Sequence, residues 1–178
     1  MVEAMRHAYV DRNFQLGDPE FWKNPLDRLL SQRHAADIRK HIDPVKATPS
    51  SQVKIGTEPH ESEQTTHYSV ADKMGNAVSV TYTLNGGYGA QIIAGDTGFL
   101  LNNEMDDFTS KVGVANMYGL VQGESNSIQP GKRPLSSMAP TIVTKDGKLF
   151  MVTGSPGGSR IITIVLESIL NVIDQKMD

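Results

Sequence analysis

Two threonines, Thr65 and Thr66, open a strand-like stretch directly after a polar segment that ends at Gln64. A threonine whose own α-amine serves as its base is one of the recognised activated nucleophiles. Thr65 would become such a catalyst if the Gln64–Thr65 bond were cut, so the sequence predicts a self-processing nucleophile there. The competing interpretation is an ordinary strand-start threonine, because threonine has a high β propensity.

Two other features could complete a site around this threonine. Thr83 lies in the predicted partner strand of the same hairpin, where it could hydrogen-bond the Thr65 hydroxyl. Gly157 and Gly158 directly precede a predicted helix, and backbone amides at a helix N-terminus suit an oxyanion. A glycine-rich tight turn would explain the two glycines equally well. Neither the Walker pattern nor the Gly-x-Gly-x-x-Gly nucleotide fingerprint is present.

A set of short polar side chains in loops suits an amino-acid-like ligand, because carboxylates hold an ammonium group while amides and hydroxyls hold a carboxylate. These side chains are Asn85, Glu104, Asp107, Ser136 and Ser137. A solvated loop or a calcium cage is the alternative for Asp106 and Asp107, but the EF-hand spacing is not met.

The sequence predicts neither a metal site nor a cofactor. The five histidines are scattered, without the paired spacing of a metal site, and His67 is expected to be a strand residue rather than a base. Cysteine is absent, which excludes disulfides, thiolate zinc sites and cysteine nucleophiles.

Apolar spacing and turn residues predict the elements that position these groups. Helices are expected over residues 1–12, 26–42 and about 160–178, the last with a buried face formed by Ile162, Val165, Leu166, Ile169, Leu170 and Ile173. Residues 44–64 are predicted to be an exposed, mobile connection, rich in Ser, Thr, Pro and Glu. Hairpins are expected from strands 67–72 and 77–84, and from strands 141–143 and 149–153.

Hairpins without βαβ units indicate an α+β layered fold with a mainly antiparallel sheet. The 178 residues suffice for one domain, and 38% hydrophobic and 21% charged residues are ordinary for a soluble chain. A net charge of -3 gives no electrostatic reason to expect nucleic acid or an anionic membrane as partner. No window has the apolar length of a membrane span, and the residues after Met1 are not expected to form a signal peptide, because no apolar h-region follows them.

Four ordered stretches resemble the gamma-glutamyltranspeptidase family, and the resemblance covers essentially the whole chain. They are Thr65-Thr66-His67-Tyr68-Ser69, residues 102–108 (NNEMDDF), residues 133–138 (RPLSSM) and residues 154–160 (GSPGGSR). The family consists of N-terminal nucleophile hydrolases with a four-layer αββα sandwich. By resemblance, the precursor cuts itself before Thr65, which then attacks the gamma-glutamyl amide of glutathione or a similar compound. The group passes to water or to an amino acid or peptide.

The resemblance also implies roles for individual residues. Thr83 supports the nucleophile, and Gly157 and Gly158 form the oxyanion hole. The glutamyl amino and carboxyl ends are held by Asn85, Glu104, Asp107, Ser136 and Ser137, while Tyr118 belongs to a lid loop. Glu104 stands where several relatives carry glutamine.

By the same resemblance, residues 1–48 are the helical end of the large subunit, residues 49–64 a mobile processing linker, and residues 65–178 an incomplete small-subunit catalytic segment. The chain is therefore expected to be an internal fragment whose partner is the remainder of the large subunit, with its carboxylate-binding arginine. The closing strands of the small subunit are expected to lie outside it too. Bacterial members are typically exported, so a periplasmic or secreted location is expected.

Two other functions compete with this one. A related N-terminal nucleophile acylase would act on acylated beta-lactams, and activity on a chromogenic gamma-glutamyl anilide would separate the two. A truncated, non-catalytic fragment would bind ligands weakly or pair through exposed strand edges, and would keep an intact Gln64–Thr65 bond.

Overall fold

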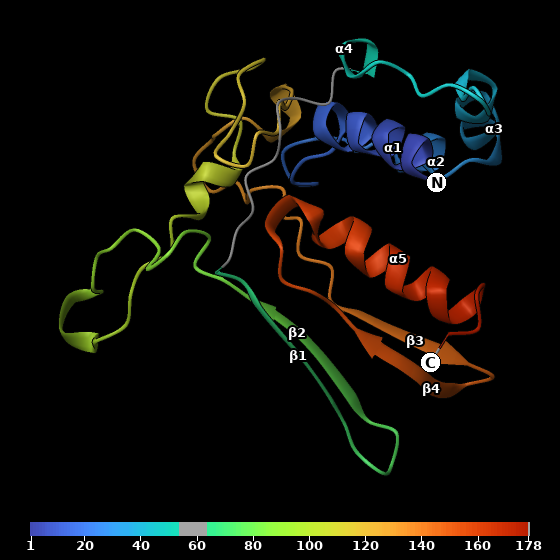
Figure 1. Ribbon diagram of the computed structural model, residues 1–178. Coiled ribbons are helices and arrows are strands. Elements are labelled where there is room, and N and C mark those ends of the chain that lie inside the picture. Colours follow the sequence, from blue (N-terminus) through green and yellow to red (C-terminus); the bar gives the residue numbers. More distant parts are fainter. Residues whose placement is uncertain (54–63, 178) are drawn as a thin grey trace. The chain divides into compact units, whose positions relative to one another are not determined.

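The computed structural model describes residues 1–53 and 64–177 (Figure 1). The chain divides into two compact units, each assembled from segments far apart in sequence. Unit 1 comprises Met1–His60 and Met105–Leu135, and unit 2 comprises Glu61–Glu104 and Ser136–Asp178. Helices and antiparallel hairpins together make a mixed α+β fold, which confirms the predicted class.

Helix α1 (Val2–Gln15) is the centre of unit 1 and continues three residues beyond the predicted end at residue 12. Helices α3 (Gln32–His41) and α4 (Ser50–Val53) both contact it. The imidazole Nε2 of His34 in α3 lies 2.6 Å from Asp11 Oδ2 in α1. Arg6 of α1 donates to the carbonyl of Thr48 at 2.7 Å, which holds the chain just before α4.

The single helix predicted over residues 26–42 is wrong, because two helices form instead. Helix α2 (Leu26–Leu29) ends before Ser31, and α3 begins after it. The Ser31 hydroxyl accepts a hydrogen bond from the His34 amide at 3.1 Å and donates to the Arg28 carbonyl at 2.7 Å. A serine that caps one helix N-terminus and closes the preceding turn interrupts the helical pattern, since its side chain replaces backbone partners.

The segment predicted as an exposed connection, residues 44–64, contains the short helix α4. Val53 at the end of α4 is only 6% exposed, so this part of the connection is packed rather than free. Most of the expected processing linker, residues 54–63, lies outside the described residues.

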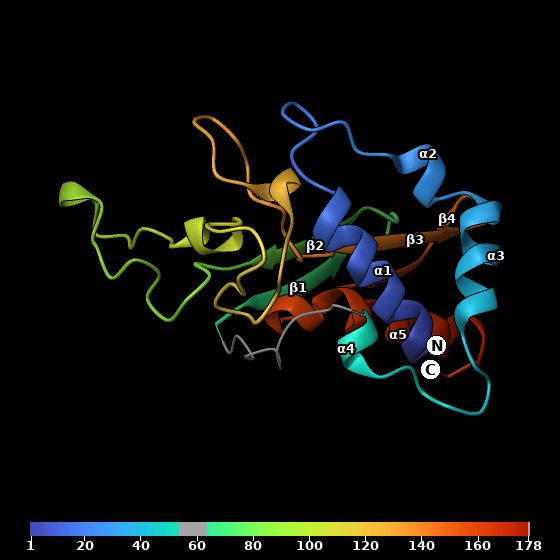
Figure 2. The same cartoon turned by 90° about the horizontal axis from the view of Figure 1, so that it is seen from above.

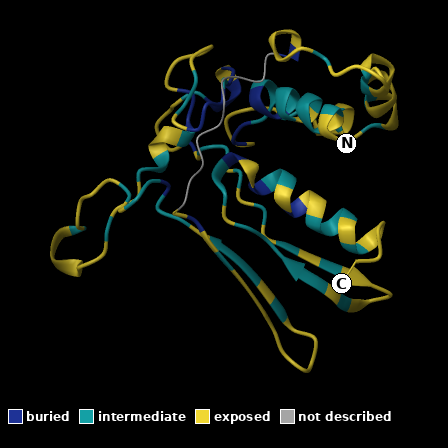
Figure 3. Ribbon diagram, in the orientation of Figure 1, coloured by how far each residue is buried: buried dark blue, intermediate teal, exposed yellow. Residues whose placement is uncertain are grey.

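The second segment of unit 1 is irregular and held by short helical turns. These are η2 (Glu104–Asp107), which begins one residue before the unit, and η3 (Glu124–Asn126), which contacts α1. An isolated parallel bridge joins Thr109 to Ser127. The buried residues of this segment include Phe108, Tyr118 and Leu120. Figure 3 colours buried parts of the chain dark blue.

Unit 2 begins with the hairpin of β1 (Thr66–Ala71) and β2 (Ala77–Tyr82), which confirms the predicted pairing. Asp72 shapes its turn, because Oδ1 accepts from the amides of Met74 at 2.8 Å and Asn76 at 3.0 Å. Thr66 pairs with Tyr82, so Thr65 and Thr83 are the next residues beyond the paired ends.

The second hairpin, β3 (Thr141–Lys145) and β4 (Lys148–Thr153), is also confirmed. Its register shifts between Val143 and Thr144, which is a β-bulge. Asp146 and Gly147 both have positive φ, 52° and 73°, as a two-residue type I′ turn requires. The Ser79 hydroxyl of β2 donates to the Thr153 carbonyl of β4 at 2.9 Å and ties the two hairpins together.

Helix α5 (Ile161–Ile173) runs alongside the β3–β4 hairpin (Figures 1 and 2) and ends five residues before the predicted boundary. Its predicted buried face is wrong in part. Ile161 and Val165 are 1% and 3% exposed, whereas Leu166 and Ile173 are 39% and 40% exposed. Residues four apart lie on one helix face, so Ile161 and Val165 mark the packed stripe, while Leu166 points away from it. No helix among the described residues is long and apolar enough to cross a membrane.

Candidate active site

Thr65 lies at the start of the first hairpin, where its hydroxyl meets that of Thr83. Thr65 is 9% exposed, and its Oγ1 donates to Thr83 Oγ1 at 3.3 Å. The contact follows from strand pairing, since Thr65 and Thr83 extend the β1–β2 register by one position. The Thr83 Oγ1 also accepts from the Asn85 amide at 2.9 Å, so one hydroxyl serves two neighbours.

Asn85 is buried at 3% exposure and has a left-handed backbone with φ of 75°. Asparagine tolerates this region better than most residues, and such outliers concentrate at functional sites. Its Nδ2 donates to the Asn103 carbonyl at 3.1 Å, while the Asn103 Oδ1 accepts from the Gly86 amide at 2.7 Å. Asn103 therefore fixes the turn that carries Asn85, a role that the sequence did not indicate.

The loop between β4 and α5 contains Gly157 and Gly158, the two residues predicted to donate to an oxyanion. Gly157 and Gly158 have φ of 127° and 55°, values that side chains other than glycine rarely adopt. A Cβ at Gly157 would also come within 3.2 Å of Ile164 Cδ1. Gly158 opens the short helix η4 (Gly158–Arg160), which leads into α5, so its amide belongs to a helix start. Backbone amides there favour negative charge.

His67 occupies β1, as predicted, and supports the loop rather than approaching Thr65 as a base. Its Nδ1 lies 2.9 Å from Thr81 Oγ1 and its Nε2 lies 3.1 Å from Ser69 Oγ. The ring packs on Gly154, where a Cβ would come within 2.1 Å of His67 Cε1. Glycine at position 154 therefore allows the end of β4 and the His67 imidazole to lie close together, because it has no Cβ.

Three of the predicted ligand-binding residues also lie in unit 2. Glu104 is half-buried, and its amide donates to Asn102 Oδ1 at 3.0 Å, which orders the start of η2. Ser136 and Ser137 lie in a segment outside any helix or strand, where the Ser136 hydroxyl accepts from the Met138 amide at 3.1 Å.

Asp107 and Tyr118 belong to unit 1 and are described within it. The Asp107 carbonyl accepts from Asn126 Nδ2 at 2.7 Å. Tyr118 is 6% exposed, and its amide donates to Asn116 Oδ1 at 3.0 Å. The same oxygen accepts from the Leu120 amide at 3.0 Å, so Asn116 shapes the tight turn on which Tyr118 lies.

An ion pair in unit 1, between a buried carboxylate and an exposed guanidinium, was not predicted from the sequence. Asp18, with a side chain 1% exposed, accepts from the Arg133 amide, Nε and Nη2 at 2.8, 2.9 and 2.7 Å. These hydrogen bonds from Arg133 hold the pKa of the Asp18 carboxyl well below its usual range. They also raise the pKa of Arg133. Arg133 lies three residues before Ser136, so the pair anchors the chain that leads to the serines.

Arg12 of unit 1 is a buried cation, 8% exposed, and donates from Nη2 to the Leu135 carbonyl at 3.3 Å. Burial lowers the pKa of its guanidinium, and the nearby Tyr9 and Asp107 oppose that shift. The segment directly before Ser136 is therefore held at two points, by Arg12 at the Leu135 carbonyl and by Asp18 at Arg133.

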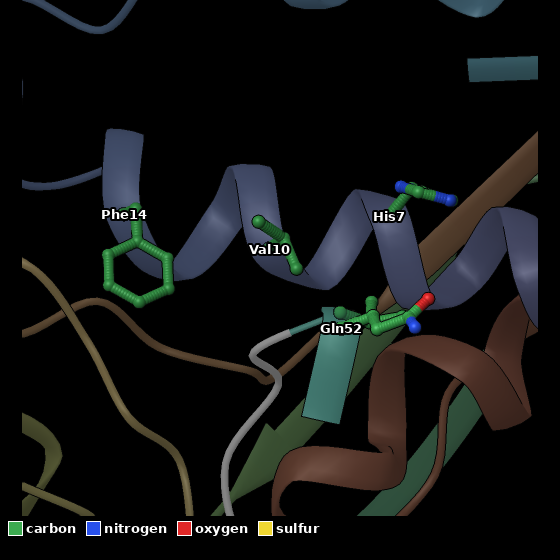
Figure 4. A pocket seen from close by; sticks show the side chains of 5 residues that line it. His7, Val10, Phe14 and Gln52 are labelled. Atoms are coloured by element: carbon green, nitrogen blue, oxygen red, sulfur yellow. The ribbon is translucent and has the colours of Figure 1, made fainter. Parts of the chain in front are cut away.

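A separate pocket of about 410 Å³ lies in unit 1 between α1 and α4 (Figure 4). It is lined by His7, Val10, Phe14, Gln52 and Val53, none of which belongs to the predicted site. Over residues 1–53 and 64–177, no group of three or more His, Cys, Asp or Glu side chains could hold a metal ion.

Comparison with known proteins gives a consistent result over the whole chain. The family model described as "Gamma-glutamyltranspeptidase" matches residues 1–178. A glutathione hydrolase proenzyme of Pseudomonas sp. (strain A14) is 66% identical over 99% of this chain, and one of Escherichia coli (strain K12) is 59% identical over 98%. The chain spans 31% and 30% of these two relatives.

A solved structure, the T380A mutant of Helicobacter pylori gamma-glutamyltranspeptidase, is also similar. It aligns with 64% of this chain and 61% of that one, with a TM-score of 0.61 and 65% sequence identity.

Proposed function

Because the chain belongs to the gamma-glutamyltranspeptidase family, we propose that it is the central segment of a self-processing gamma-glutamyl acyltransferase and hydrolase. The observation that carries the proposal is the hydrogen bond between Thr65 Oγ1 and Thr83 Oγ1 at the mouth of the first hairpin. The relatives named glutathione hydrolase proenzymes support both the substrate class and the processing step.

Processing begins with the intact chain, in which Thr65 has no free amine. The Thr65 hydroxyl attacks the Gln64 carbonyl carbon, the C–N bond breaks, and the proton lost by the hydroxyl ends on the released amine. Water then hydrolyses the resulting ester, which leaves a carboxylate on Gln64 and a free hydroxyl and α-amine on Thr65. Thr83 supports the attack, because its oxygen orients the Thr65 hydroxyl.

In turnover the Thr65 hydroxyl attacks the gamma-carbonyl of the substrate while its own α-amine takes the proton. A free α-amine has a reference pKa of roughly 7.7–8.0, so it is a competent base near neutral pH. The amides of Gly157 and Gly158 stabilise the oxyanion, where each donor is worth roughly 10²–10³ in rate. The leaving amine takes the proton, and an ester to Thr65 remains until water or an acceptor amine removes the acyl group.

The glutamyl head group is the second half of the proposed site. Carboxylates at Glu104 and Asp107 bind the α-ammonium, while Asn85, Ser136 and Ser137 donate to the α-carboxylate. The left-handed turn at Asn85 supports this role, because it places this buried residue beside Thr83, whose hydroxyl accepts from the Asn85 backbone amide. Tyr118 belongs to the lid over this site, and acceptor amino acids or peptides enter after the first product leaves.

The finer architecture is also a proposal. The two hairpins and α5 supply one sheet and one helical layer of a four-layer αββα sandwich, and the remainder of the large subunit supplies its partner layers. The division into residues 1–48, 49–64 and 65–178 follows from the proposed cut. We place the whole protein in the periplasm or outside the cell, which fractionation of cells that express it would test.

The decisive experiment combines intact mass, N-terminal sequencing and turnover of a chromogenic gamma-glutamyl anilide. A new N-terminus at Thr65 and release of the anilide are expected for the unmodified protein, and neither for Thr65→Ala. Turnover by Thr65→Ala at the unmodified level would overturn the assignment of the nucleophile. An uncut, inactive chain that stays uncut when extended at both ends would favour a non-catalytic fragment. Cleavage with turnover of acylated beta-lactams alone would favour the acylase.

A further inference from the structure

Asn126 is a fully buried residue whose side chain joins two separate backbone segments of unit 1. It is 0% exposed and ends the short helix η3. Its Nδ2 donates to the Asp107 carbonyl at 2.7 Å and to Gln122 Oε1 at 2.6 Å. Its Oδ1 accepts from the Leu135 amide at 2.9 Å. Both amide hydrogens and the oxygen are therefore used.

The two segments that Asn126 joins carry opposite ends of the proposed glutamyl site. Asp107 is proposed to bind the α-ammonium, and Leu135 is bonded directly to Ser136, which is proposed to bind the α-carboxylate. Both hydrogen bonds go to main-chain atoms, so they fix the path of each segment rather than one side-chain rotamer. Lost bonds to buried groups are costly, because the orphaned partners stay desolvated.

Leu135 is held from its other side as well. Its carbonyl accepts from Arg12 Nη2 at 3.3 Å, while its amide is bound by Asn126. Pro134 fixes the backbone just before it, and Arg133 is clamped by Asp18. The contact through Asn126 also reaches the backbone of Asp107. This side chain is thus a direct link between the two segments.

The geometry points to Asn126 as a positioning residue that sets the spacing between the backbones of Asp107 and Leu135, the residue directly before Ser136, and thereby selects substrates with an intact α-amino acid head. The inference rests on the proposed function. In an α-amino acid the ammonium and carboxylate share one carbon, so the groups that bind them must keep a fixed separation. A misplacement of about 1 Å in such a site costs on the order of 10²-fold.

Three variants test this role in the protein. Asn126→Ala removes both links. Asn126→Asp is nearly isosteric and keeps an acceptor for the Leu135 amide, but its carboxylate cannot donate to the Asp107 carbonyl. Ser125→Ala is the matched control, because Ser125 is also 0% exposed in η3 and its Oγ has no hydrogen-bond partner among the described residues. Thermal unfolding of each variant shows whether it is folded.

The measurements are KM and kcat for a gamma-glutamyl anilide and for two analogues, one without the α-carboxylate and one without the α-amino group. Asn126→Ala is expected to raise KM for the complete substrate about tenfold or more, with kcat within about threefold, because uniform binding is lost. Its preference for the complete substrate over both analogues should fall. In Asn126→Asp, the preference for the complete substrate over the analogue without the α-amino group should fall more than the preference over the analogue without the α-carboxylate. Ser125→Ala should change neither KM nor these preferences.

The outcomes separate this inference from the proposed function. If the unmodified protein neither cuts before Thr65 nor turns over the anilide, the proposed function fails and the inference falls with it. If the unmodified protein is active, two results overturn the role of Asn126 alone. One is an equal loss on all three substrates in folded Asn126→Asp or Asn126→Ala. The other is a loss of kcat and of Gln64–Thr65 cleavage with KM unchanged.

Discussion

At the scale of single residues, the Thr83 hydroxyl connects the proposed nucleophile, Thr65, to Asn85. Its oxygen accepts from Thr65 Oγ1 and from the Asn85 amide, so it couples the proposed nucleophile to the left-handed turn at Asn85. A serine at position 83 would keep this oxygen, whereas a valine would keep only the shape.

We therefore expect Thr83→Val to slow both Gln64–Thr65 cleavage and anilide turnover by about tenfold, since two hydrogen bonds of roughly 0.5–1.5 kcal/mol each are lost. Thr83→Ser should stay within about threefold of the unmodified protein. Cleavage followed by electrophoresis and turnover followed by absorbance measure the two rates. Equal behaviour of the two variants would exclude the oxygen as the relevant group.

At the scale of elements, the strand end of β4 depends on a close approach of two hairpins. The His67 ring of β1 occupies the space where a Cβ of Gly154 would stand, 2.1 Å from Cε1. The same glycine begins the loop that carries Gly157 and Gly158, so any displacement there reaches the proposed oxyanion donors.

Gly154→Ala should therefore destabilise the fold by about 1–3 kcal/mol, the usual cost of overpacking, and lower turnover. In the double variant with His67→Ala the clash is removed, and the added cost of the Gly154 substitution should fall close to zero. Urea unfolding of the two single variants and the double variant measures this coupling. Additive losses would show that His67 and Gly154 do not compete for the same space.

The Asp18–Arg133 pair connects the segment after α1 to the segment before Ser136. The pair depresses the pKa of Asp18, so its stabilisation is complete above the unfolded-state value near 3.8 and is lost as the pH falls below it. We expect Asp18→Asn to unfold at lower urea than the unmodified protein at pH 7, with the difference shrinking below pH about 3.8. Glu20→Gln is the control, because Glu20 contacts the same guanidinium at 72% exposure. A constant difference from pH 7 to pH 2 would contradict this account.

Local signals explain which elements the sequence predicted well. Both hairpins were expected from alternating residues and turn residues such as Asp146-Gly147, which act within a few positions. The helix break at Ser31 was missed because helical spacing continues across it. The Asp18–Arg133 pair and the links of Asn126 were missed for another reason. Asp18 and Arg133 lie 115 positions apart, and Asn126 reaches Asp107 and Leu135, 19 and 9 positions away, across irregular loops. No helix or strand pattern encodes such contacts.

The site divides in the same way. Thr65 and Thr83 could be paired from the sequence, since a short hairpin fixes which residues face each other. The supporting roles of Asn103 and Asn126 depend on irregular loops whose path is set by tertiary contacts. The motif around residues 102–108 marked the region without telling which asparagine would hold the turn.

At the scale of the whole molecule, unit 1 draws on both sides of the proposed cut. Residues from Met1–His60 pack with residues from Met105–Leu135, and their links include Asp18 with Arg133, Arg12 with Leu135, and the Gly123 amide with the Asn13 carbonyl at 2.9 Å. The two fragments that processing produces are therefore expected to stay bound to each other as one complex.

Size-exclusion chromatography after processing should give a single peak that contains both residues 1–64 and residues 65–178. The double variant Asp18→Asn with Arg12→Gln should release one fragment from the other at lower urea than the unmodified protein. Two separate peaks for the unmodified protein without denaturant would contradict this assembly.

Because unit 1 contains residues from both sides of the proposed cut, its folding is expected to differ before and after processing. Before the cut, the linker keeps residues 1–60 and 105–135 on one chain, so their meeting is intramolecular and its rate does not depend on dilution. After the cut, the same contacts are a second-order encounter between two molecules. A processed sample that is unfolded and diluted should thus recover in proportion to its concentration, whereas an uncut Thr65→Ala sample should recover equally at every concentration. Processing would then make assembly hard to repeat, because the cut that frees the Thr65 amine also removes the covalent connection between the two segments of unit 1.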